Sequence, residues 1–82
     1  MGKLIVIKKK DIEQLRLAES IDGVSILLLQ DGTYLGGKTN AKTYVSAEDA
    51  KKRGLIIDSA DMVNYAEIVS LLLERGHTVV NL

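Results

Sequence analysis

The chain has 82 residues, which is enough for one small domain spanning residues 1–82. It holds no cysteine and a single histidine, so disulfides, zinc–thiolate sites, a persulfide on this chain and a histidine-based metal cluster are all excluded. Hydrophobic residues make up 46%, and 11 basic residues balance 11 acidic ones. This composition indicates a globular core and argues against a nucleic-acid binder that works by bulk charge.

The first ten residues, "MGKLIVIKKK", combine an apolar run with a basic run. The continuous apolar residues within 3–8 predict a strand that is buried on both faces, as in parallel sheets. The basic run follows the apolar stretch, which is the reverse of a signal peptide. No apolar run in the chain approaches the length of a membrane span. We therefore expect a cytoplasmic protein without membrane contact.

A helix and a second strand are predicted next. Apolar residues recur at helical spacing at Ile12, Leu15 and Ala18, and Asp11 stands where an N-cap residue is expected. Residues 24–30, "VSILLLQ", form the strongest strand signal of the sequence.

The glycine-rich stretch "DGTYLGGKTN", residues 31–40, separates this strand from another one. Residues 41–46, "AKTYVS", alternate in the manner of a strand. We interpret the glycine-rich stretch as a turn in which the chain reverses direction between the two strands.

Two helices are marked in the second half of the chain. Each begins at residues that resemble a capping box and ends at a glycine: Ser46 with Asp49 and Gly54, then Asn64 with Glu67 and Gly76. Between them, a strand is favoured at residues 61–63 over residues 55–57, and residues 77–82 predict a last strand. Strands that alternate with helices indicate an α/β fold. We expect a three-layer α/β/α sandwich with a mainly parallel sheet of about five strands.

Residues 32–39, "GTYLGGKT", match the P-loop pattern G-x-x-x-x-G-K-[ST]. In a P-loop, glycine N–H groups cradle phosphates, a lysine neutralises them and a hydroxyl holds Mg²⁺, which would assign these roles to Gly32, Gly37, Lys38 and Thr39. The preceding strand favours this reading, and "LIID" ending at Asp58 superficially resembles a Mg²⁺-ordering strand. However, the residues after Thr39 predict a strand where a P-loop needs a helix. Nucleotide binding is therefore the less favoured alternative to a simple turn.

Three segments between residues 26 and 72 carry motifs in a fixed order: "ILLLQDGTY" (26–34), "YVSAEDAKKRGL" (44–55) and "ADMVNYAEIVSLL" (60–72). The motif residues are Gln30, Asp31 and Gly32, then Tyr44, Asp49, Arg53 and Gly54, then Asn64 and Tyr65. In this combination they resemble the DsrH/TusB family, within the DsrE/DsrF/DsrH sulfur-relay superfamily.

The resemblance implies an α/β/α sandwich and a role in the cytoplasmic relay that passes sulfur towards 2-thiolation of the wobble uridine of certain tRNAs. In that relay three related subunits assemble, and the TusD-type subunit carries the persulfide cysteine. The resemblance therefore implies a non-catalytic subunit without a cofactor, with cysteine-bearing DsrE/TusD-like and DsrF/TusC-like partners. A homo-oligomeric module that binds a small ligand is the alternative.

We place the candidate ligand- or partner-binding site at Gln30, Asp31 and Gly32, followed by Tyr34. These residues follow a predicted strand, and open parallel sheets bind ligands beyond the carboxyl ends of their strands. Asp31 could instead cap the turn through its own backbone. Tyr34 is either an interface anchor or a lid on the small core.

Three further groups of residues, outside the candidate site, also lead to predictions. Asp49 and Arg53 lie four residues apart, which predicts an ion pair within one helix. Residues 8–10 and 51–53 are basic clusters that we interpret as solvated faces, with direct tRNA contact only if the fold brings them together. The apolar run at residues 71–73 is too continuous for one helix face, so the helix is buried on more than one side or meets another subunit.

Overall fold

Strands and helices alternate along the residues that the structure describes, which are 3–57, 60–74 and 79–81. In this computed structural model the elements are β1 (Leu4–Ile7), α1 (Ile12–Glu19), β2 (Ser25–Leu28), η1 (Gln30–Lys38), β3 (Lys42–Ser46), α2 (Ala47–Lys52), β4 (Asp61–Val63), α3 (Tyr65–Glu74) and β5 (Val79–Asn81). The segment η1 is a 3₁₀ helix. The α/β class is confirmed.

The strands form one parallel sheet of five strands in the order β4-β3-β2-β1-β5. Residues of β1 and β2 are buried along their whole length, because these strands lie at the centre of the sheet and are covered on both faces. From β1 to β4, each strand lies beside the one before it in the chain, and β5 lies on the other side of β1. All carboxyl ends therefore meet at one edge of the sheet, which we call the carboxyl edge.

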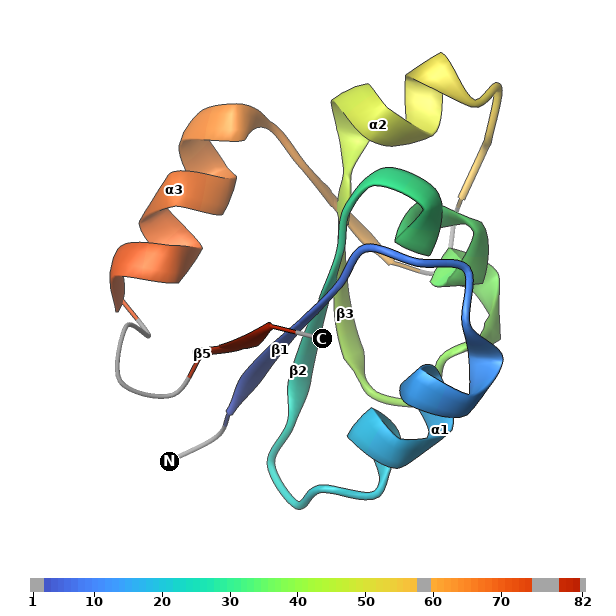
Figure 1. Ribbon diagram of the computed structural model, residues 1–82. Helices are drawn as coiled ribbons and strands as arrows, with labels where there is room; N and C mark the ends of the chain where they lie inside the picture. The colour runs from blue at the N-terminus through green and yellow to red at the C-terminus, as the bar shows by residue number, and fades with distance from the viewer. Residues whose placement is uncertain (1–2, 58–59, 75–78, 82) are drawn as a thin grey trace.

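The sheet separates two hydrophobic cores. Successive residues of β1 point to opposite faces, so Ile5 and Ile7 enter one core while Leu4 and Val6 enter the other. The first core packs against α1, η1 and α2 through Leu15, Leu35 and Ala50. The second packs against α3, which is the one helix among the described residues on that side of the sheet (Figure 1). The three-layer arrangement is thus confirmed, with unequal outer layers.

Side-chain caps fix the starts of α1 and α3 where they were predicted. The Asp11 carboxylate accepts hydrogen bonds from the N–H groups of Glu13 at 3.0 Å and Gln14 at 3.3 Å. Asn64 and Glu67 cap α3 reciprocally: the Glu67 N–H donates to Asn64 Oδ1 at 2.8 Å, and the Asn64 N–H donates to Glu67 Oε1 at 3.1 Å. Such bonds satisfy N–H groups that have no partner within the helix.

The helix α2 keeps only part of its predicted capping box. The Asp49 N–H donates to Ser46 Oγ at 3.3 Å, but the Asp49 carboxylate bonds to the backbone of Gln30. After α2, Gly54 adopts the left-handed conformation with φ of 67°, as predicted for a helix stop. The predicted stop of α3, Gly76, lies outside the described residues.

The prediction of a reversing turn at residues 31–40 is wrong. Strands β2 and β3 are parallel, so the chain has to return from the carboxyl edge to the opposite edge before β3 begins. The 3₁₀ helix η1 makes that return. At a rise of about 2 Å per residue, it is long enough to run back along the length of a short strand. Leu35 anchors η1 in the first core with 1% of its surface exposed.

The C-terminal part follows the predicted order. The strand at residues 61–63 is confirmed as β4, and β5 lies within the predicted last strand, of which residues 77, 78 and 82 are outside the described residues. Asp58 is outside them as well. Among the described residues, no helix has the length and apolar character needed to cross a membrane.

Candidate functional site at the carboxyl edge

Gln30, the second residue after β2, has a strained backbone. Its φ is 49°, in the left-handed region that residues with a side chain rarely adopt. The Gln30 N–H donates to Asp49 Oδ2 at 2.9 Å, so a carboxylate on α2 holds this conformation in place. The Gln30 side chain is exposed. Strain of this kind gathers at functional sites more often than elsewhere.

Asp31 forms an ion pair across the chain with Arg53, and this corrects two predictions. Arg53 Nε donates to Asp31 Oδ1 at 3.0 Å, and Arg53 Nη1 donates to the Asp49 carbonyl oxygen at 3.1 Å. Asp31 therefore does not cap its own turn, and Arg53 does not pair with the Asp49 carboxylate. The physical reason is that Gln30 engages that carboxylate, while η1 brings Asp31 to the end of α2.

Gly32 is required by a close approach between η1 and the end of β1. A Cβ atom at this position would lie 2.2 Å from the carbonyl oxygen of Ile7, at the end of β1. The Gly32 N–H donates to the Leu29 carbonyl oxygen at 2.9 Å and starts η1. Only glycine fits without displacing β1. The triplet Gln30-Asp31-Gly32 therefore joins β1, β2 and α2 at the carboxyl edge.

Tyr34 lies at the surface with 38% of its area exposed, while its neighbour Leu35 fills the core. Lys10 Nζ stands 5.0 Å from the centroid of the Tyr34 ring, a cation–π contact that fixes the ring against the end of β1. Both roles considered for Tyr34, an interface anchor and a lid on the core, stay predictions. A partly exposed aromatic ring is of the kind enriched in contact surfaces.

A pocket of about 210 Å³ opens beside this network, between the N-termini of α2 and α3. Its lining is Leu29, Ser46, Glu48, Asp49, Tyr65 and Ile68. No sequence pattern predicted this pocket, although Tyr65, directly after the N-cap of α3, is one of the motif residues. Across the described part of the chain, no three His, Asp or Glu side chains gather closely enough to hold a metal ion.

The four residues of the P-loop pattern do not form one site. Gly32 lies at the carboxyl edge, whereas Thr39 follows η1 at the opposite edge, about 14 Å away for seven residues of 3₁₀ helix. The Thr39 hydroxyl is occupied within the chain, since it bonds to Thr43 Oγ1 at 2.9 Å and accepts from the Ala41 N–H at 3.1 Å. The residues that follow form β3, as predicted, and so no helix N-terminus faces Gly37 and Lys38.

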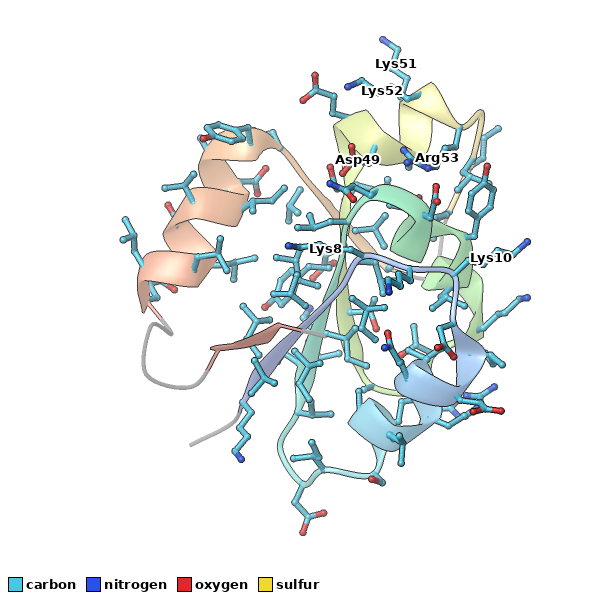
Figure 2. All side chains as sticks on the ribbon, viewed as in Figure 1. Lys8, Lys10, Asp49, Lys51, Lys52 and Arg53 are labelled. Atoms are coloured by element: carbon cyan, nitrogen blue, oxygen red, sulfur yellow. The ribbon has the colours of Figure 1, made fainter. Side chains whose placement is uncertain are left out.

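The two basic clusters share the carboxyl edge but do not converge. Figure 2 shows Lys51 and Lys52 projecting away from the molecule beyond α2, while Lys8 and Lys10 extend from the end of β1 in different directions. The Arg53 side chain pairs with Asp31, so it does not add its charge to the surface formed by Lys51 and Lys52. The arrangement agrees with solvated faces and gives no continuous basic patch.

Most residues that carry the resemblance to the DsrH/TusB family lie in the contacts described here at the carboxyl edge: Gln30, Asp31, Gly32, Asp49, Arg53, Asn64 and Tyr65. Tyr44 stands apart in the second core. In comparisons with known proteins, no family model matches the chain and no curated protein matches it. The resemblance and the geometry of the carboxyl edge are the basis of the function proposed next.

Proposed function

We propose that the chain is a non-catalytic subunit of a sulfur-relay assembly of the DsrE/DsrF/DsrH type, working in the cytoplasm towards tRNA 2-thiolation. In this proposal it holds a cysteine-bearing relative against its own carboxyl edge. The chain has no cysteine and therefore does not carry a persulfide itself. Its part is to position the partner that does.

The observation that carries the proposal is the strained conformation of Gln30. Glycine would adopt a φ of 49° without strain, yet the position holds a residue with an exposed polar side chain. A side chain that is kept at the expense of stability is expected to make a contact of its own. The hydrogen bond from Gln30 to Asp49 and the ion pair between Asp31 and Arg53 hold it in position for that contact.

The surroundings of Gln30 support contact with a protein. Tyr34 and Tyr65 are both exposed, and Tyr65 lies in the pocket with Leu29 and Asp49. Aromatic residues are enriched in protein interfaces. The interactions beneath them are fixed within one chain, so little ordering would be needed on binding. An 82-residue domain also gains stability from a neighbouring subunit.

The test is native mass spectrometry of the tagged chain purified gently from its own host. We expect a complex with small cysteine-containing relatives. A bare homo-oligomer would contradict the proposal. A matched pair of variants localises the contact: Tyr34→Ala at the carboxyl edge should release the partner, while Asn40→Ala at the opposite edge should retain it.

A homo-oligomeric module that binds a small ligand is the second candidate, and the pocket of about 210 Å³ at the same edge favours it. Its lining mixes apolar side chains with Ser46 and two carboxylates, as small-molecule sites do. In this case the purified protein would contain a small molecule detectable by mass spectrometry after denaturation. Tyr65→Ala, which removes one wall of the pocket, should lose that molecule.

A further inference from the structure

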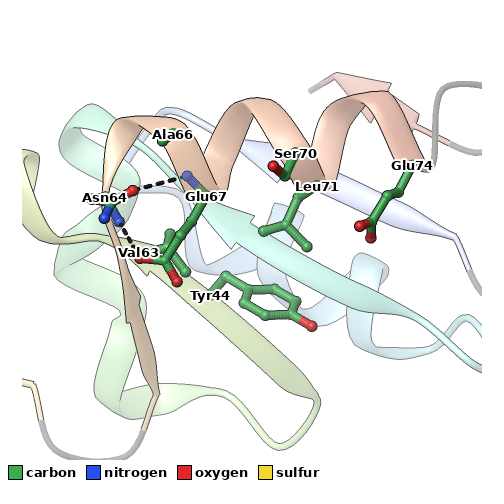
Figure 3. A pocket seen from close by; sticks show the side chains of 8 residues that line it. All are labelled: Tyr44, Val63, Asn64, Ala66, Glu67, Ser70, Leu71 and Glu74. Carbon is green, nitrogen blue, oxygen red and sulfur yellow. Dashed lines mark hydrogen bonds between the residues drawn. The ribbon is translucent and has the colours of Figure 1, made fainter.

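A groove of about 360 Å³ runs along α3 on the second face of the sheet. It is lined by Tyr44, Val63, Asn64, Ala66, Glu67, Ser70, Leu71 and Glu74 (Figure 3). The groove exists because α3 is the one described helix on this face and leaves β3 and β4 partly uncovered. The opposite face has three helical segments over the same sheet.

The helix α3 presents two different sides. Ile68, Leu71 and Leu72 pack against the second core, but no residue of α3 is fully buried. Glu67, Ser70 and Glu74 recur at helical spacing along the flank that faces the groove. The flank therefore forms a polar, acidic wall above an apolar floor.

The floor of the groove consists of Tyr44, Val63 and Leu71. Figure 3 shows Leu71 and Glu74 extending from α3 towards the side on which the Tyr44 ring lies. At one end of the ring, Lys42 Nζ stands 5.3 Å from its centroid and also pairs with Asp61. The hydrogen bond and the charge of Asp61 raise the pKa of Lys42, so its charge is already committed within the chain.

We propose that this groove receives an amphipathic helix of a partner protein, with apolar side chains on the floor and Lys or Arg side chains along Glu67 and Glu74. A sheet face is covered by helices packed side by side, and the groove is the place where a second helix of this layer is missing. Among the described residues, neither Glu67 nor Glu74 forms an ion pair. Glu67 also accepts a hydrogen bond from the Asn64 N–H in the capping box, but its negative charge is not neutralised by it. Two carboxylates with no ion pair among the described residues, beside an apolar floor, favour a basic partner. The groove begins at Asn64, near the carboxyl edge, and extends along α3 to Glu74, and the proposal holds whether or not the partner belongs to a sulfur relay.

A second copy of this chain fits the groove poorly. Pairing α3 with its own copy would oppose Glu67 and Glu74 to the same carboxylates, and like charges across an interface are costly. The helix α1 exposes Ile12 and Leu17, but Glu13 stands beside them and the charge of its Arg16 is already paired with Glu19. The charges of the described helices therefore favour a different protein as the occupant.

The first test uses two synthetic helical peptides that share one leucine stripe, flanked by lysine in one peptide and by glutamate in the other. They are titrated into the isotope-labelled protein and followed by NMR chemical shifts. We expect the lysine peptide to bind about tenfold more tightly, since each of two exposed charge pairs contributes a few-fold. The shifts should concentrate at Asn64, Ser70 and Leu71. Equal affinities, or shifts confined to other parts of the molecule, would overturn the proposal.

A charge-neutral variant tests the acidic wall while keeping the fold. In the double variant Glu67→Gln and Glu74→Gln, glutamine at position 67 still serves the capping box of α3. We expect this variant to bind the lysine peptide about tenfold more weakly than the wild-type protein, because the same two charge pairs are removed. The control variant Glu13→Gln with Asp22→Asn changes the same number of charges away from the groove. An equal loss in both variants, at unchanged Tm, would refute a role for the wall.

A photo-crosslinking residue placed at Ser70 identifies the occupant in the host. We expect an adduct whose cross-linked partner peptide is a helix with an apolar stripe and flanking Lys or Arg. An adduct with a second copy of this chain, or no adduct, would overturn the proposal. The peptide titration does not depend on the sulfur-relay assignment. A result that contradicts the groove proposal can therefore be distinguished from one that contradicts the proposed function.

Discussion

The two faces of the sheet differ in how completely they are covered. Among the residues whose burial the structure describes, ten buried side chains form the core sealed by α1, η1 and α2, whereas four form the core under α3. The same strands supply both faces, so the difference comes from the helices. Tyr65 and Leu73 of α3 remain 75% and 78% exposed. The sealed face accounts for the stability of the fold, and the open face is suited to contacts.

The largest expected effect is on the unfolding free energy, when a leucine is removed from each of the two cores. Leu28→Ala empties a fully buried position under η1, and we expect it to cost about 3 kcal/mol of unfolding free energy. Leu72→Ala removes the same atoms from a half-buried position on α3 that packs against the second core, where about 1 kcal/mol is expected because less apolar area is lost. Urea denaturation of both variants measures the difference. Equal losses would contradict the account of a sealed and an open face.

The next effect concerns the junction of η1 with β1. Gly32→Ala places a methyl group against the Ile7 carbonyl oxygen, and we expect it to cost about 2 kcal/mol through the shift that it forces on the backbone. Gly37→Ala is the matched control, because nothing lies within 4 Å of its Cβ position. The control should leave stability unchanged or raise it slightly. Destabilisation of both variants to the same extent would show that the close approach at Gly32 is not decisive.

A smaller effect is expected at the ion pair that joins η1 to α2. Arg53→Ala removes the partner of Asp31 and the hydrogen bond to the Asp49 carbonyl oxygen. Because the Asp31 carboxylate is largely exposed, the expected loss is about 0.5–1 kcal/mol. Lys52→Ala, one residue away and fully solvated, should change stability by less than this. Thermal unfolding at low and high salt resolves the two variants.

The smallest effect is expected from nucleotides. Because Gly32 and Thr39 lie at opposite edges of the sheet, Mg-ATP or Mg-GTP should not shift the Tm of the wild-type chain or of Lys38→Ala. A ligand at a hundred times its Kd would add about 2.7 kcal/mol. A stabilisation of that size that disappears in Lys38→Ala would restore the P-loop interpretation.

The parts of the fold that depend on residues close together in the sequence could be predicted from it. The continuous apolar residues of β1 and β2 and the caps at Asp11 and Asn64 are local signals. The nature of η1 was missed because its glycines resemble those of a turn. The reason for Gly32 lies in a contact with Ile7, and the partner of Asp31 is Arg53, 22 residues further along the chain. Such contacts depend on how the crossover packs, which a local pattern does not contain.

The most direct test of the central claim, that the carboxyl edge is a partner surface, is the variant Gln30→Gly. Relief of the left-handed strain should raise the unfolding free energy by about 1 kcal/mol. The account predicts that this more stable protein loses the cysteine-bearing partner when purified from its host, as read by native mass spectrometry. A variant that is stabilised and retains the partner in full would contradict the claim.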